Sequence, residues 1–117
     1  MTTTYAPILL FVYNRPQHVC NVVQSLLQNA LAAESDIFIY SDAPKNETDG
    51  KNVAEVREYI RTIKGFKTVT LIKRTENWGL ARSIIDGVTT QVNRFGRVIV
   101  MEDDLIAAPY FLSLIHI

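Results

Sequence analysis

Strand and helix signals alternate along this chain, and that alternation constrains its fold more than any other feature. Apolar segments of strand length occur at 8–13, 37–40, 69–72 and 98–101. Between them, apolar residues recur at helical spacing over about 16–32, over 53–63 and over 80–92. This β-α-β-α-β-α-β succession predicts an α/β fold, a parallel sheet with helices on both faces and right-handed crossovers. We expect about four strands, in the spatial order 3-2-1-4.

Turn residues mark the expected ends of the helices. Pro16 suits the first position of the first helix, and a polar loop is expected over 43–50. Gly65 is expected to close the second helix in a left-handed cap. The third helix should begin after Asn77-Trp78-Gly79 and end at Gly96.

Length, charge and composition limit the kind of protein this is. The chain has 117 residues, enough for at most one domain, and its 12 basic and 12 acidic side chains cancel. A nucleic acid or an anionic membrane as partner would favour a surplus of positive charge, and this chain has none. No apolar run approaches the roughly 20 residues of a membrane span, and residues 1–4 lack the basic start of a signal peptide. We expect a cytoplasmic protein with a lone cysteine, Cys20, and no disulfide.

Three acids in a row, Glu102-Asp103-Asp104, follow directly on the apolar run 98–101. That run is expected to be a buried parallel strand, so its acids lie at the carboxyl edge of the sheet, where open α/β proteins bind ligands. Three adjacent carboxylates repel one another, and a hard divalent cation such as Mg²⁺ or Mn²⁺ would relieve the repulsion. The alternative is a solvated acidic loop.

The other strands should deliver polar residues to the same crevice, because every strand-to-helix connection leaves a parallel sheet at one edge. These residues are Asn14-Arg15, Ser41-Asp42 and Thr75-Glu76-Asn77. A guanidinium close to a metal favours a diphosphate ligand, and Asp42 could accept a hydrogen bond from a base N–H or a ribose hydroxyl. Neither of the glycine-rich phosphate loops is present. The crevice therefore predicts a nucleoside-diphosphate site in which a metal holds the phosphates.

Each of these residues also has a purely structural interpretation. Arg15 could cover the end of the first helix, and Asp42 could be a turn residue. Trp78 is expected to be packed rather than stacked on a base. Arg82, one turn into the third helix, either reaches the crevice or pairs with Asp86 at i,i+4.

Four segments in order resemble the nucleotide-binding half of GT-A-fold glycosyltransferases, the family 2-like inverting enzymes. Within these, the group related to N-acetylglucosaminyltransferase I is most similar. The segments are 8–16, 39–42, 77–82 and 98–104, the last carrying a D-x-D-type acidic motif in the form Glu102-Asp103-Asp104. Ala108-Pro109-Tyr110-Phe111 also resembles the segment after that motif, so the match spans about 7 to 112. The resemblance implies a Rossmann-like fold for this part.

The resemblance also implies roles for single residues and names the partner. Asp42 would hydrogen-bond the base of a nucleotide-diphosphate sugar, for which a UDP-sugar is favoured, and Arg15 would lie against the nucleotide. Glu102 and Asp103 would face the ribose or the donor sugar. Asp104 would ligate Mn²⁺ or Mg²⁺ bridging the diphosphate. Asn14 and Arg82 complete the expected binding residues.

Inverting transfer to an acceptor hydroxyl also needs a carboxylate base. In these enzymes the base comes from the acceptor half, well after the acidic motif, so we expect no catalytic residue in this chain. Residues 1–112 would be the donor half-domain, and 113–117 a truncated or non-native tail. A half-sheet of this kind leaves an edge open for self-association.

Three other functions remain open. The chain could be a non-catalytic nucleotide-binding module or an inactive fragment. A nucleotidyltransferase is the third, although such enzymes usually carry a loop rich in glycine and basic residues after the first strand, where this chain has Tyr13-Asn14-Arg15-Pro16.

Overall fold

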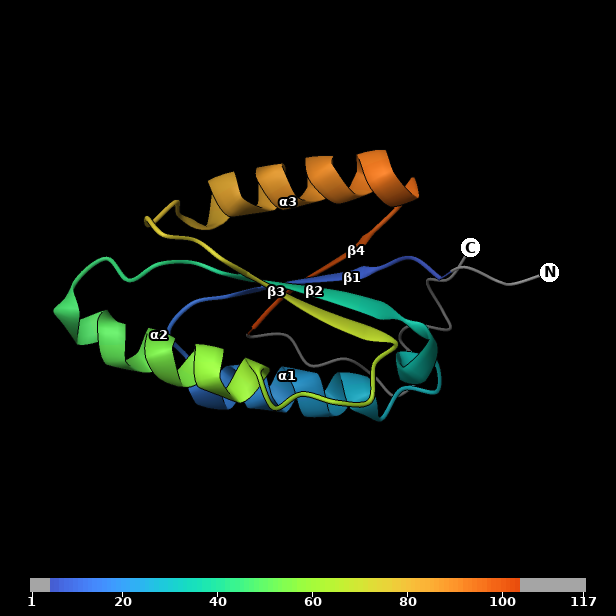
Figure 1. Ribbon diagram of the computed structural model, residues 1–117, viewed down its shortest axis with the longest axis horizontal. Coiled ribbons are helices and arrows are strands. Elements are labelled where there is room, and N and C mark those ends of the chain that lie inside the picture. The colour runs from blue at the N-terminus through green and yellow to red at the C-terminus, as the bar shows by residue number, and fades with distance from the viewer. Residues whose placement is uncertain (1–4, 104–117) are drawn as a thin grey trace.

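The computed structural model describes residues 5–103, which form a four-stranded sheet with helices on both faces (Figure 1). The strands are β1 (Ile8–Val12), β2 (Asp36–Ser41), β3 (Thr68–Lys73) and β4 (Ile99–Glu102). Their order is β3-β2-β1-β4, and all neighbouring pairs are parallel. The predicted fold class and strand order are therefore confirmed. The four strand exits lie at one edge of the sheet.

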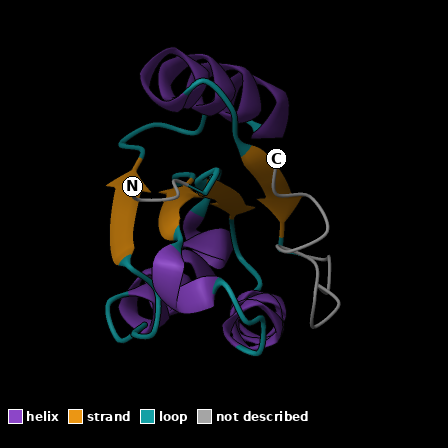
Figure 2. Cartoon of the chain, turned by 90° about the vertical axis from the view of Figure 1, so that its right-hand side faces the viewer, coloured by secondary structure: helices purple, strands orange, loops and turns teal. Residues whose placement is uncertain are grey.

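The helices form two unequal layers. On one face of the sheet, α1 (Pro16–Leu27) and α2 (Glu47–Ile60) lie side by side, while α3 (Leu80–Phe95) alone covers the other face (Figures 1 and 2). A short 3₁₀ helix, η1 (Ala32–Glu34), precedes β2. Each layer buries its own apolar cluster against the sheet.

The central position of β1 in the sheet explains why its sequence is apolar throughout. Ile8, Leu10 and Val12 belong to the cluster under α1 and α2, whereas Leu9 and Phe11 belong to the cluster under α3. All five residues of β1 are buried. A strand covered on both faces cannot alternate between apolar and polar residues.

The first helix is shorter than predicted, ending at Leu27 rather than near 32. The reason is local competition for backbone donors. The N–H of Leu31 donates to the side-chain oxygen of Asn29 at 3.1 Å, and Ser35 donates its hydroxyl to the Leu31 carbonyl at 2.8 Å. Such side-chain bonds replace the backbone bonds that would continue a helix.

The second helix begins earlier than predicted, because α2 starts at Glu47 inside the expected polar loop. Asn46 caps it by accepting the N–H of Asp49 at 2.9 Å. The first turn carries no apolar side chain, so apolar periodicity could not reveal it. Since α2 ends at Ile60, Gly65 lies beyond the helix and does not form its cap, although its φ is 109°. Gly96, with a φ of 85°, does close α3 as predicted.

The fourth strand is an edge strand rather than a fully buried one. Val100 is 40% exposed, and within residues 5–103 β4 pairs only with β1. Pairing of this edge with a second copy stays a prediction. Asp104 and the expected tail at 113–117 lie outside the described residues. In the part of the chain that the structure describes, no helix has the length and apolar character needed to cross a membrane.

Candidate functional site

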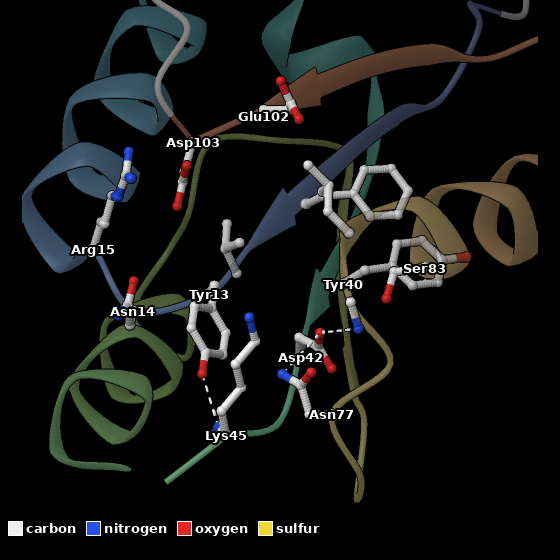
Figure 3. Close-up of a pocket in the computed structure, with 14 residues that line it drawn as sticks. Tyr13, Asn14, Arg15, Tyr40, Asp42, Lys45, Asn77, Ser83, Glu102 and Asp103 are labelled. Carbon is white, nitrogen blue, oxygen red and sulfur yellow. Dashed lines mark hydrogen bonds between the residues drawn. The ribbon is translucent and has the colours of Figure 1, made fainter. Parts of the chain in front are cut away.

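A pocket of about 290 Å³ opens at the carboxyl edge of the sheet, and every strand exit contributes to it (Figure 3). Its walls are formed by Phe11, Val12, Tyr13, Asn14, Arg15, Tyr40, Asp42, Lys45, Asn77, Gly79, Leu80, Ser83, Glu102 and Asp103. Glu102 and Asp103 lie along one side, and Asp42 and Asn77 lie across from them (Figure 3).

Five of the seven predicted site residues are brought together here. They are Asn14, Arg15, Asp42, Glu102 and Asp103. Arg82 does not line the pocket, and its part in binding stays a prediction. Asp104, the predicted metal ligand, falls outside the described residues.

The exit of β1 is tied to the start of α2 through Asp49. The Tyr13 hydroxyl donates to one carboxylate oxygen of Asp49 at 2.7 Å, and the Asn14 amide donates to the other at 2.9 Å. Both bonds lower the pKa of Asp49 below its usual value, and the bond from Tyr13 has the larger effect. The Tyr13 hydroxyl also accepts the backbone N–H of Lys45 at 2.8 Å. This network fixes the position of Asn14 in the pocket wall.

Asp42 holds the segment between β3 and α3 in place. Its carboxylate is buried, with the residue 8% exposed, and accepts the backbone N–H groups of Trp78 and Gly79, each at 2.9 Å. The carboxylate also accepts the backbone N–H of Ala43 at 2.9 Å and the side-chain amide N–H of Asn77 at 3.3 Å. Because Gly79 is the N-cap of α3 and offers no side chain, Asp42 supplies the negative charge that a helix N-terminus favours.

The floor of the pocket is aromatic. Phe11 and Tyr40 are opposite one another on β1 and β2, and their rings stack with centroids 5.0 Å apart. Gln91 of α3 donates to the Tyr40 hydroxyl at 3.1 Å, which fixes the tyrosine ring. The pocket therefore joins an apolar floor to a polar rim, as small-molecule sites commonly do.

Trp78 lies beside the pocket but does not line it. The guanidinium groups of Arg74 and Arg82 lie over its ring, at 3.9 Å and 4.0 Å from the centroid. Arg74 also forms an ion pair with Asp86 at 2.7 Å, so the alternative pairing of Arg82 with Asp86 is replaced by this contact. Trp78 is therefore packed against two cations, which stabilise its ring through cation–π interactions.

The carboxylates at the end of β4 suit a divalent cation. Among the described residues no group of three acidic, histidine or cysteine side chains could enclose a metal ion. Glu102 and Asp103 supply two carboxylates at the pocket rim. Mg²⁺ is commonly held by one or two carboxylates together with substrate phosphates, so this donor set fits a metal that binds with its ligand.

Sequence reasoning missed several residues of the site. Tyr13 directly precedes Asn14-Arg15, and that adjacency was a usable signal. Lys45 and Asp49 were hidden inside the expected polar loop. Ser83 lies on the α3 face that meets the sheet, where it is buried. Only the three-dimensional packing of α3 identifies it as a wall of the pocket.

Comparison with known proteins bears on the fold. No protein-family model matches the sequence, and neither does any curated protein. Among solved structures, the chain is similar to "Mannosyltransferase PcManGT from Pyrobaculum calidifontis in complex with GDP-Man and Mn2+", with a TM-score of 0.55 and 17% identity. The match covers 95% of this chain and 31% of the mannosyltransferase. This chain therefore shares the fold of part of a glycosyltransferase and spans less than a third of its length.

Proposed function

We propose that this chain is the nucleotide-sugar-binding part of a metal-dependent glycosyltransferase. One observation carries the proposal: a single pocket joins an aromatic floor to three carboxylates, those of Asp42, Glu102 and Asp103, and to two cations, Arg15 and Lys45. A nucleoside diphosphate sugar has two corresponding parts. Its base has an apolar ring face that suits an aromatic floor, and its diphosphate is an anion that suits a charged rim. The likeness to a mannosyltransferase solved with GDP-Man and Mn²⁺ supports the same choice.

The base of the nucleotide would lie at the aromatic floor, near Asp42. The longest of the four bonds to the Asp42 carboxylate is the 3.3 Å contact from Asn77, and the Asn77 amide also donates to the Ala43 carbonyl at 2.7 Å. A base N–H could therefore replace Asn77 at this oxygen while Asn77 keeps its other partner. The two backbone donors of the α3 start would stay in place.

The diphosphate would lie toward Arg15 and Lys45, with Asn14 beside it. Asp104 would ligate Mn²⁺ or Mg²⁺ together with the phosphates, and Glu102 and Asp103 beside it would face the ribose or the donor sugar. When bound, such a metal stabilises the negative charge of a departing diphosphate. We favour a UDP-sugar as donor, and transfer to an acceptor hydroxyl with inversion. Arg82 would contribute to the positive field near this rim.

Calorimetric titration of UDP and GDP, with and without Mn²⁺ or Mg²⁺, tests the proposal. The metal should increase nucleotide affinity at least tenfold, about 1.4 kcal/mol. Asp104→Asn should remove most of that gain. The matched control is Glu55→Gln, an exposed acid on α2 that lies outside the pocket. Equal binding with and without metal, in the unaltered chain and in Asp104→Asn, would contradict the assignment.

A further inference from the structure

A second pocket lies on the α2 side of the same sheet edge, and its charged residues are mostly basic. It has a volume of about 320 Å³ and is lined by Arg57 of α2, by Arg61 directly after that helix and by Lys73 at the end of β3. Glu58 is its one acidic lining residue. Pro44 lines this pocket, whereas Asp42 and Lys45 on either side of it in sequence line the first. We propose that this second pocket binds a compact oxyanion such as a phosphate group.

Arg57 is the fixed element of the pocket. Its Nε donates to the Ser41 hydroxyl at 2.8 Å. Its Nη2 lies 3.2 Å from the carbonyl oxygens of Ser41 and Asp42 and 3.1 Å from that of Arg74. These contacts join the exits of β2 and β3 and hold the guanidinium in one orientation. A donor fixed in advance loses little conformational freedom when a ligand binds.

The Arg57 guanidinium makes no direct ion pair among residues 5–103, although the Asp42 carboxylate is close enough to interact with its charge. All four of its hydrogen-bond acceptors are neutral oxygens, and no carboxylate lies within ion-pair distance among residues 5–103. Burial lowers the pKa of the guanidinium from its usual value, because water is partly removed from around the charge. Its Nη1 has no hydrogen-bond partner in the described part of the chain. An anion at Nη1 would satisfy both the donor and the charge.

The neighbouring charges strengthen this field. Lys73 has no hydrogen bond or ion pair from its side chain within the described ranges. Arg61 pairs with Glu58 at 3.2 Å, but these side chains are 59% and 73% exposed, so the pair is screened by water. Three cations therefore face one anion around the pocket, a net charge that suits a doubly charged phosphate.

Phosphate titration followed by nuclear magnetic resonance tests the proposal directly. The Nε–H resonance of Arg57 is a suitable probe, because its bond to the Ser41 hydroxyl slows exchange with water. Sodium phosphate would be added to the ¹⁵N-labelled chain while sodium chloride holds the ionic strength constant. We expect a saturable shift of the Arg57 resonance, with a dissociation constant on the order of 1 mM.

Matched variants separate a built site from general charge. Lys73→Gln should weaken phosphate binding at least threefold, and the double variant Arg61→Gln, Lys73→Gln should abolish saturation. The control is Lys67→Gln, an exposed lysine before the other end of β3. It removes the same charge and should leave the titration unchanged. Neither tested side chain holds the fold as Arg57 does, so these variants should remain folded.

Two results would overturn the proposal. One is a linear, unsaturated shift that Lys67→Gln reduces as much as Lys73→Gln does. The other is a phosphate response at Tyr13 and Asn77 without one at Arg57, which places the ion in the first pocket. A parallel titration with a sugar phosphomonoester distinguishes the source of the oxyanion. Tighter binding than inorganic phosphate assigns the site to a phosphate carried on a larger molecule, and equal binding assigns it to free phosphate.

Discussion

Asp42 directly follows β2, and its buried carboxylate accepts hydrogen bonds mainly from the segment 77–79. Two of these donors are backbone N–H groups at the start of α3, so the side chain positions one wall of the first pocket. Its proposed contact with a nucleotide base depends on this arrangement. Loss of the carboxylate should therefore affect both folding and binding.

We expect Asp42→Ala to lower the free energy of unfolding by about 3 kcal/mol, because it leaves partly buried backbone donors without an acceptor. Urea denaturation followed by the fluorescence of Trp78, the single tryptophan, measures this. The control is Asp36→Ala at the opposite end of β2, where the carboxylate bonds only the exposed Thr68 hydroxyl. It should cost no more than about 0.5 kcal/mol. Equal effects of the two changes would contradict the positioning role.

Asp49 should make stability depend on pH in the acid range. Hydrogen bonds from Tyr13 and then Asn14 lower its pKa below the ordinary 3.8. A carboxyl whose pKa is lower in the folded state stabilises the fold above its unfolded pKa. That contribution is lost as the pH falls through the folded pKa. The unaltered chain should therefore lose stability below about pH 4 more steeply than Asp49→Asn.

Urea midpoints measured from about pH 2 to about pH 7 test this. The difference between the two chains should be constant above about pH 5 and should shrink in acid. Tyr13→Phe removes the larger of the two causes, so it should give an intermediate pH dependence. The same acid sensitivity in the unaltered chain and in Asp49→Asn would disprove the role assigned to this carboxyl.

At the scale of elements, α3 approaches the sheet closely because Gly87 faces it. A Cβ at this position would lie 3.0 Å from Cζ of Phe11 and 3.1 Å from Cζ of Tyr40, the two rings that form the pocket floor. The missing side chain therefore sets the distance between α3 and the sheet. It also sets the height of the pocket beneath the start of α3.

Two glycine substitutions in helices should have opposite effects. Gly87→Ala forces the aromatic floor to move, and such overpacking costs about 1–3 kcal/mol. The higher helix propensity of alanine offsets about 1 kcal/mol of this. The net destabilisation of the fold should therefore be about 1 kcal/mol. Gly50→Ala in α2 meets no atom within 4 Å and should stabilise by up to about 1 kcal/mol. Thermal denaturation of both variants measures the difference. Stabilisation by both would show that α3 is not held at its closest approach.

At the scale of the molecule, each face of the sheet has its own core, and both pockets lie at the carboxyl edge. The first pocket adjoins α3 and the second adjoins α2. Among the described residues, the segments that follow the strands thus supply polar side chains to both pockets. The carboxylates in the walls of the first pocket are Asp42, Glu102 and Asp103, for which we propose nucleotide-sugar binding, and a catalytic base outside them stays a prediction.

We expect sugar transfer by this chain to stay near background even where nucleotide binding is measurable. A general base contributes about 10²–10⁴-fold to rate, and positioning of the acceptor contributes further. The assay is release of nucleoside diphosphate from UDP- and GDP-sugars, with simple sugars as acceptors. An intact glycosyltransferase assayed with its own donor is the positive control. Robust metal-dependent turnover would show that the base lies within these 117 residues.

Sequence patterns were enough to predict the order of the elements, the parallel sheet and the edge at which the candidate site lies. Apolar periodicity is a local property, and the handedness of crossovers restricts how such elements can assemble. The structure brings together around the first pocket the five residues that this pattern predicted to share one edge, Asn14, Arg15, Asp42, Glu102 and Asp103. The start of α2 was missed because its first turn carries no apolar side chain to make a pattern.

The contacts that these residues make depend on how the layers pack, and the sequence patterns did not predict them. Asp42 reaches the start of α3, and Asp49 reaches the exit of β1, in both cases across 35 or more positions of sequence. Arg57 joins the exits of β2 and β3 in the same way. Hydrogen bonds are short and directional, so their partners follow from how the layers pack and not from spacing along the chain. Periodicity places a residue on a face or at an edge, and packing alone selects its neighbour.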